Sequence, residues 1–177
     1  MKKLAIVFSV LFLMLLGVEM VNAQNEVTSN PATASARIIQ TLQISKDRDI
    51  DFGTFTAVNG NVVLTPVAST VRSTTGPVLS GGVPTSAMFT VTGSAGEAYT
   101  VSYPASITLT NTFTPGQTMI LAPSCNVNGN AGVLSGTIGG GTGTQVLYVG
   151  GTLAVAATNT TGLYQNTADL KVTVNYN

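Results

Sequence analysis

The sequence predicts an all-β protein, folded as a β-sandwich or a Greek-key barrel. Beyond residue 23, threonine, valine, serine, glycine and asparagine dominate, whereas lysine, glutamate, arginine and glutamine are scarce. The first group contains strand formers and turn residues, and the second contains good helix formers. Apolar and polar residues alternate with a period of two in several short stretches, and glycine and proline separate these stretches. The combination predicts many short strands and no helix.

Residues 1–23 have the three parts of a secretory signal peptide. Lys2 and Lys3 give a positive start, the stretch 4–18 is almost wholly apolar, and small residues precede a cleavage site after Ala23. The apolar run is shorter than the roughly 20 residues that a membrane-spanning helix needs. We therefore expect an exported protein that is soluble or assembles outside the membrane. Residues 24–31 are expected to be a flexible polar segment, followed by one domain over 32–177 without a membrane span.

Composition excludes several classes of function. Histidine is absent and cysteine occurs once, which excludes a Ser-His-Asp triad, a histidine-ligated zinc site and an internal disulfide. Removing Lys2, Lys3 and Glu19 from seven basic and seven acidic residues leaves five and six, a net charge of −1. This balance offers no basic patch for nucleic acid. We expect a structural or binding protein, not an enzyme, with no cofactor and no nucleic-acid partner. Two interpretations of Cys125 are open: an inert thiol that is buried or half-buried, or a disulfide with another chain.

The first expected strand covers residues 32–44. The even-numbered residues of this stretch, which we call its apolar parity, are apolar except Gln40. The odd-numbered residues are polar except Ile39. Two interpretations are open: the strand pairs within its own domain, or residues 32–39 insert into a neighbouring subunit and complete its sheet. The apolar parity consists of Ala32, Ala34, Ala36, Ile38, Leu42 and Ile44.

Three acidic residues follow this stretch. Alternation places Asp47, Asp49 and Asp51 on one side of an extended chain, where carboxylates can bind Ca²⁺. Lys46 and Arg48 stand between them and can neutralise them, and the glycine and distal glutamate of a calcium loop are missing. The three are weak metal candidates, and no metal site is expected.

The remaining strands are expected between turn signals. Asn59-Gly60 predicts a hairpin between residues 52–58 and 62–64. The continuous apolar runs 62–64 and 146–149 predict strands covered on both faces. The glycine-rich stretch 136–144 lacks the Lys-Ser/Thr ending of a phosphate-binding loop and predicts a surface loop. Alternation also predicts strands over 87–91, 99–103, 107–109 and 170–176, the last with Leu170, Val172, Val174 and Tyr176 on its apolar face.

Four short motifs carry a family resemblance. Ile50-Asp51-Phe52-Gly53 resembles the "LdFG" signature of a bacterial exported family known as domain of unknown function 4402. Residues 150–153, 161–164 and 172–177 resemble the closing motifs of that family. The layout is similar, more distantly, to the spore coat U family, which includes pilins of the archaic chaperone–usher pathway. Those proteins usually carry a cysteine shortly after the donor segment, and residues 42–49 contain none.

The resemblance implies an incomplete immunoglobulin-like, pilin-like sandwich of about seven to ten strands. It also implies that residues 32–39 are donated to the next subunit and that residues 170–176 form the last strand, at the acceptor groove or at a periplasmic chaperone. The expected function is therefore a fimbrial, pilin-like subunit that assembles with itself or with related subunits. The resemblance also implies a bacterial protein that passes through the periplasm to the cell surface or the medium. The expected subunit contacts are Ala32, Ala34, Ala36, Ile38, Leu170, Val172, Val174 and Tyr176.

Two alternatives stay open. The first is a self-complete monomeric surface adhesin or glycan-binding module, which would need exposed aromatic residues in a concave site. The second is an exported hydrolase that uses carboxylates alone. The aromatic candidates for the first are Tyr99, Tyr103, Tyr148 and Tyr164, although tyrosines in alternating strands more often belong to a core.

Overall fold

The computed structural model describes residues 27–177, apart from the side chain of Asn130, and the all-β prediction is confirmed. The expected signal peptide lies outside the described residues. The chain divides into two units, residues 1–37 and 38–177. All strands belong to the second unit: β1 (Gln43–Arg48), β2 (Thr54–Phe55), β3 (Gly60–Leu64), β4 (Arg72–Thr75), β5 (Leu79–Gly81), β6 (Ala87–Ser94), β7 (Ala98–Ser102), β8 (Ile107–Asn111), β9 (Thr118–Cys125), β10 (Gly129–Val133), β11 (Thr142–Val155), β12 (Tyr164–Gln165) and β13 (Thr173–Tyr176).

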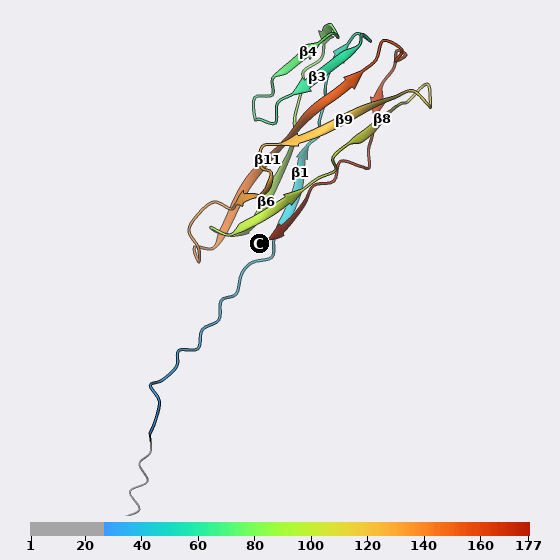
Figure 1. Ribbon diagram of the computed structural model, residues 1–177. Coiled ribbons are helices and arrows are strands. Elements are labelled where there is room, and N and C mark those ends of the chain that lie inside the picture. Colours follow the sequence, from blue (N-terminus) through green and yellow to red (C-terminus); the bar gives the residue numbers. More distant parts are fainter. Residues whose placement is uncertain (1–26) are drawn as a thin grey trace, which may run out of the picture. The chain divides into compact units, whose positions relative to one another are not determined.

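The largest sheet has eight antiparallel strands and is organised around β11 (Figure 1). Its main path runs β1-β6-β11-β9-β8-β12, and β3 and β4 attach beside β11. The first part of β11 pairs with β6 up to Val149, and from Gly151 the same edge pairs with β3. Pairing with β9 occupies the opposite edge over residues 149–154. Gly150 and Gly151 therefore lie where β11 changes partners.

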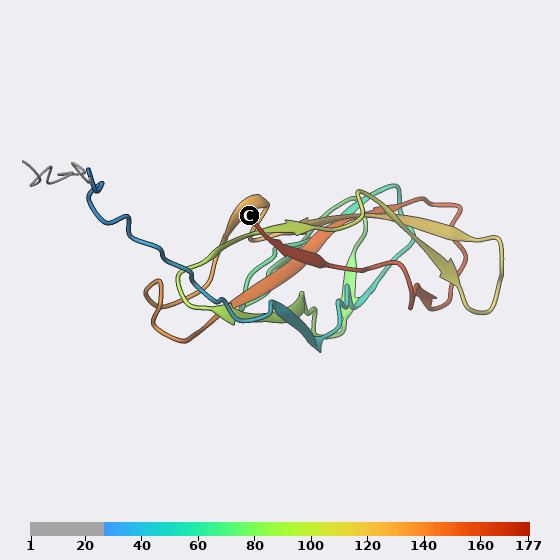
Figure 2. The ribbon, with the colours of Figure 1, turned by 90° about the horizontal axis from the view of Figure 1, so that it is seen from below.

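A three-stranded sheet, β10-β7-β13, packs against one half of the large sheet. The C-terminal strand β13, dark red in Figure 2, belongs to this smaller sheet, whereas β11 belongs to the large one. The core between the layers joins Tyr99 and Val101 of β7 to buried residues of β6 and β11. Tyr99 is 0% exposed, and its hydroxyl donates a hydrogen bond to Gln145 Oε1 at 2.7 Å. This packing of two sheets makes half of the domain a sandwich.

A second core fills the other half of the domain. Phe52 packs there with buried residues of β3, β8, β9 and β11. Cys125 belongs to the first core and is a free, buried thiol, in line with the first of its two interpretations. Burial raises the pKa of this thiol, so the reactive thiolate is disfavoured. Among residues 27–177, no helix is long and apolar enough to cross a membrane.

Three local predictions are wrong. The expected hairpin at Asn59-Gly60 does not form, because β2 pairs with β5 and β3 pairs with β4 and β11. The run 146–149 is covered on one face only, since Val146 is 37% exposed. The glycine-rich stretch is not a loop throughout, because β11 begins at Thr142.

The long strand expected over residues 32–44 is also corrected. The strand begins only at Gln43, because its partner β6 ends at Ser94, close to the pairing of Gln43 with Thr92. Residues 27–42 are without secondary structure. An isolated extended segment without a partner strand leaves its backbone groups to water.

Candidate subunit interface

Strands β1 and β13 are each paired on one side only. β1 pairs with β6 in the large sheet, and β13 pairs with β7 in the small sheet. Their inner faces meet along what we call the β1–β13 seam, formed by Leu42, Ile44, Val172, Val174 and Tyr176. All five are half-buried and pack against the first core.

The seam is a side of the first core that stays partly open to solvent. Phe89 and Val91, on β6 beside β1, are at most 7% exposed, whereas the seam residues stay partly open to solvent. The edges of the two strands differ in charge. β1 carries Lys46 and Arg48, and charged residues protect a free edge against pairing. Residues 173–176 read Thr-Val-Asn-Tyr, without charge or proline, and their register with β7 is regular. The β13 edge is therefore the more receptive of the two.

Leu170, Val172, Val174 and Tyr176, four of the residues predicted to contact another subunit, are brought together against the core. The other four belong to the N-terminal segment. Ala32, Ala34 and Ala36 are exposed and lie in the unit that ends at Arg37. Ile38, at the start of the second unit, is 98% exposed. Burial of a fully exposed isoleucine against a partner makes the free energy of association more favourable.

A cluster of hydrogen bonds holds the chain at Gln40, next to the seam. The Tyr176 hydroxyl donates to the Gln40 carbonyl at 3.0 Å and accepts from the Ser94 amide at 2.8 Å. The Gln40 amide donates to Ser94 Oγ at 2.6 Å, and Thr142 Oγ1 donates to the Gln40 side chain at 2.9 Å. We call this cluster the Gln40 clamp. It fixes the point from which residues 38 and 39 leave the domain.

The partners of the Gln40 clamp were not predicted from the sequence. The one available signal was Gln40 itself, the only polar residue in the apolar parity of residues 32–44. Gly93 gives the tyrosine room, because a Cβ there would lie 2.3 Å from the Tyr176 hydroxyl.

Replacing Tyr176 by phenylalanine is expected to loosen the Gln40 clamp. The change leaves the Ser94 amide and the Gln40 carbonyl without their partner, at a cost of about 1–3 kcal/mol. Amide hydrogen exchange at Gln40 should become faster by at least tenfold. Tyr103→Phe is the matched control, because its hydroxyl bonds Asn128 elsewhere, and it should leave exchange at Gln40 unchanged. Equal exchange rates in the two variants would contradict this role for Tyr176.

The Ile-Asp-Phe-Gly motif is structural. Asp51 Oδ1 accepts a hydrogen bond from the Gly53 amide at 2.7 Å, and Gly53 has a positive φ of 69°. Phe52 inserts into the second core, and Arg72 Nη1 donates to its carbonyl at 2.7 Å. The motif turns the chain and fastens it to β4.

The three acidic candidates each have a different partner. Asp47 Oδ2 accepts from Thr90 Oγ1 at 2.6 Å, Asp49 pairs with Lys46 at 2.6 Å, and Asp51 closes the turn described above. In residues 27–177, no group of three acidic, cysteine or histidine side chains is placed to hold a metal ion.

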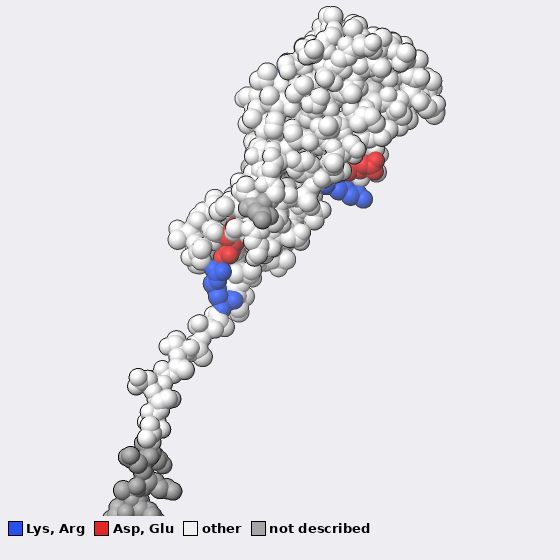
Figure 3. All heavy atoms as spheres, in the orientation of Figure 1, with Lys and Arg blue, Asp and Glu red and all other residues white. Residues whose placement is uncertain are grey.

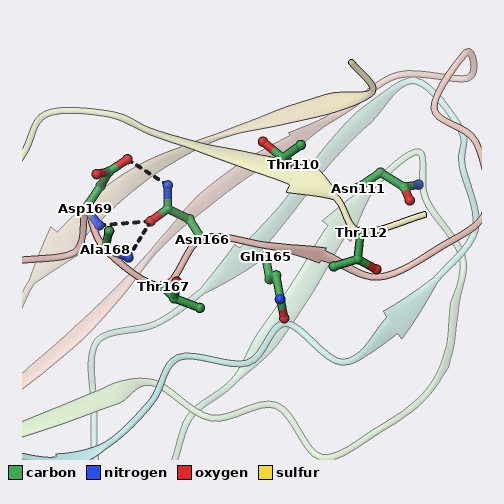
Figure 4. A pocket seen from close by; sticks show the side chains of 8 residues that line it. All are labelled: Thr110, Asn111, Thr112, Gln165, Asn166, Thr167, Ala168 and Asp169. Carbon is green, nitrogen blue, oxygen red and sulfur yellow. Dashed lines mark hydrogen bonds between the residues drawn. The ribbon is translucent and has the colours of Figure 1, made fainter. Parts of the chain in front are cut away.

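A shallow hollow of about 340 Å³, lined mostly by residues with polar side chains, lies beside β8 and β12 (Figure 4). The Asn166 side chain holds one side of the hollow through hydrogen bonds: it donates to Asp169 Oδ2 at 2.7 Å and accepts from the amides of Ala168 and Asp169. None of the four candidate tyrosines lines it. Tyr99 is buried and the other three are half-buried, so no freely exposed tyrosine marks a sugar-stacking site.

The comparisons with known proteins give one match. A family model described as Domain of unknown function (DUF4402) matches residues 42–176. The match begins at the seam residue Leu42 and ends at Tyr176 of the Gln40 clamp. No curated protein and no solved structure matches the chain.

Proposed function

The chain belongs to the DUF4402 family, and from its seam and its N-terminal segment we propose that it is a fimbrial, pilin-like subunit that assembles by strand exchange. In this proposal, residues 32–39 of one copy pair with the free edge of β13 in the next copy. The proposed polymer is built on the surface of a bacterium after export, with a periplasmic chaperone as a further proposed partner. The subunit has no catalytic role in this proposal.

One observation carries the proposal: the half-buried seam lies beside an uncharged strand edge. Unpaired backbone groups at a sheet edge bind extended segments, while alternate side chains cover an apolar face. The alternation of Ala32, Ala34, Ala36 and Ile38 supplies such a face from a segment without secondary structure. Head-to-tail repetition of this contact gives a fibre. The Gln40 clamp would set the length of chain available to the neighbour.

The burial free energies of the alternating side chains indicate that one of them contributes most of the side-chain affinity. Burial of an isoleucine contributes about 1.5–3 kcal/mol, and that of an alanine methyl about 0.8 kcal/mol. Ile38 is therefore the expected anchor. Backbone hydrogen bonds along the β13 edge would supply the remaining affinity.

Deletion of residues 24–39 from the mature chain is expected to abolish polymers. Size-exclusion chromatography with light scattering should give ladders for residues 24–177 and only monomer or amorphous aggregate for the deletion. Unchanged polymers from the deletion would refute strand exchange through this segment.

A pair of point variants sharpens the same test. Ile38→Asp places a carboxylate on the apolar parity and should reduce polymer yield at least tenfold, because a buried isoleucine is lost and a charge must be desolvated. Ser35→Asp adds the same charge on the other parity and should polymerise normally. Equal loss in both variants would argue for a charge effect without strand insertion.

A self-complete surface-binding domain is the second candidate. The observation in its favour is that unit 38–177 contains two buried cores of its own. Two stable monomers, one with and one without residues 24–39, would favour this candidate over strand exchange.

A further inference from the structure

Two exposed apolar residues lie on neighbouring segments at the opposite end of the domain from the Gln40 clamp. Phe113, in the loop after β8, is 80% exposed, and Leu163, just before β12, is 58% exposed. The Thr112 amide donates to the Leu163 carbonyl at 2.8 Å, which joins the two segments. Figure 1 shows the loop between β8 and β9 at the far end of the domain from the C-terminus. We call Phe113 and Leu163 the apolar tip.

A buried asparagine holds the two segments of the apolar tip. Asn111 is 1% exposed, and its Oδ1 accepts hydrogen bonds from the amides of Phe113 at 2.9 Å and Thr114 at 3.1 Å. Its Nδ2 donates to the Thr161 carbonyl at 3.3 Å, on the segment that leads to Leu163. A buried side chain with several partners fixes the backbone around it. The apolar tip is therefore preorganised, so a partner can cover it at a small cost in conformational entropy.

The hollow beside β8 and β12 lies between the apolar tip and the last strand. Thr112, next to Phe113, and Asp169 both line the hollow, and Figure 4 shows them on different sides of it. Leu170 follows Asp169 and begins the stretch 170–176, whose residues alternate between half-buried and exposed. A partner chain that leaves this stretch at Leu170 therefore emerges beside the hollow and close to the apolar tip.

The proposed strand exchange, on which this inference rests, brings a second copy to the same place. Every strand pairing within residues 27–177 is antiparallel. An antiparallel donor starts beside Tyr176 and ends beside Leu170, because the eight residues of 32–39 match the seven of 170–176. A parallel donor would end beside Tyr176, where the Gln40 clamp already holds the chain of the accepting copy. The antiparallel arrangement is therefore the one that gives head-to-tail repetition.

The donating copy has no spacer between its donor segment and its domain. Residues 32–39 are followed directly by Gln40, which the clamp holds. The Gln40 end of the donating domain must then lie over the hollow and the apolar tip of the accepting copy. At that end Ile138 is 62% exposed, in the loop that leads to Thr142, which bonds Gln40. This loop lies closely on Gly96, where a Cβ would be 2.6 Å from the Ile138 amide nitrogen.

We propose that Ile138 of the donating copy packs against the apolar tip of the accepting copy. The contact is small, but the inserted strand keeps the two surfaces together at a high effective concentration, so a weak contact is sufficient. It would fix the angle between successive copies and stiffen the fibre. In the view of Figure 3 no charged side chain lies over the loop between β8 and β9, and residues 98–168 contain none. Sodium chloride should therefore not weaken the contact, because no ion pair is screened.

Two cysteine substitutions made together in the mature chain, Phe113→Cys and Ile138→Cys, test the contact. Within one copy the two positions lie beyond opposite ends of β11, whose 14 residues span about 46 Å, so a disulfide can join them only between copies. Polymers are oxidised with diamide, alkylated and separated by denaturing electrophoresis. The pair should give a covalent ladder, at least tenfold stronger than that of the control pair Val83→Cys and Ile138→Cys. Val83 is 81% exposed but lies away from the apolar tip, between β5 and β6.

Light scattering on each variant before oxidation separates this contact from strand exchange. Polymers that give no covalent ladder from the Phe113 pair, or equal ladders from both pairs, would overturn the contact and leave strand exchange standing. An unmodified chain that forms no polymers would refute strand exchange, and this contact with it.

Phe113→Ser gives a second measurement without a covalent bond. Because Phe113 is exposed, the urea midpoint of the monomer should not change. Polymers of this variant should still form but should dissociate in urea at least fivefold faster than those of the unmodified chain. Val83→Ser is the control and should dissociate like the unmodified chain. Equal dissociation rates for the two variants would also overturn the contact.

Discussion

Gly150→Ala is expected to lower the free energy of unfolding by about 3 kcal/mol or more. A Cβ at this position would lie 2.2 Å from the Leu64 carbonyl oxygen and 3.0 Å from the Pro66 amide nitrogen. Both are backbone atoms, and the Leu64 carbonyl cannot move without disturbing the pairing of β11 with β3, in which Leu64 is opposite Gly151. Gly150 is not among the glycines with positive φ. The expected loss of stability is therefore steric. It arises at the point where β11 stops pairing with β6 and begins to pair with β3.

Gly139→Ala is the matched control for this steric effect. Gly139 has a φ of 84°, and nothing lies within 4 Å of its would-be Cβ. Its replacement should cost only about 1 kcal/mol, from the unfavourable backbone conformation. Urea unfolding followed by circular dichroism measures both values. A smaller loss for Gly150→Ala than for Gly139→Ala would contradict the close approach of β3 to β11.

Patterns within single strands predicted much of the fold. The alternation of Val172, Val174 and Tyr176 correctly placed these residues on one inward face, and the closing motifs correctly indicated the DUF4402 family. These features depend on neighbours in the sequence, where a period of two is sufficient evidence for a half-buried strand. The relationship to spore coat U proteins and pilins stays a prediction.

Pairing between distant segments could not be predicted in the same way. Asn59-Gly60 has the composition of a hairpin turn, yet Gly60 begins a strand that pairs with β4 and β11. A Cβ on Gly60 would lie 1.6 Å from the Thr75 carbonyl oxygen, so the glycine serves a close approach to β4. The same sequence signal thus supports two different structures, and the partner strand decides between them.

The Gln40 clamp shows why only part of the candidate site could be predicted from the sequence. Its hydrogen bonds join Gln40 to Ser94, Thr142 and Tyr176, residues that are 54 or more positions away. No spacing rule relates such residues before the sheets are assembled. The alternation in residues 32–39, by contrast, lies within eight consecutive residues and was evident from the sequence.

Tyr99→Ala is expected to cost about 3–5 kcal/mol of stability. The ring is 0% exposed at the centre of the first core. Gly132 faces it so closely that a Cβ there would lie 2.6 Å from the ring. Tyr99→Phe keeps the ring and removes one hydrogen bond, and Gln145 Oε1 still accepts from the Val133 amide at 3.0 Å. The phenylalanine variant should lose only about 1 kcal/mol, and thermal or urea unfolding separates the two.

The same tyrosine is expected to make the fold sensitive to alkali. Burial, and secondarily the negative charge of a deprotonated Cys125, raises the pKa of Tyr99 from its ordinary value near 10 to about 12. The folded protein then retains a proton that the unfolded chain has already lost, so the stabilisation is complete below about pH 10 and is lost as the pH rises to about 12. Because Tyr99→Phe cannot ionise there, the difference in urea midpoint between the unmodified protein and this variant should shrink over that interval. Since the other four tyrosines and Cys125 are present in both proteins, their titration should largely cancel in the comparison. A constant difference from pH 9 to pH 12 would show that the Tyr99 hydroxyl is not held in an apolar core.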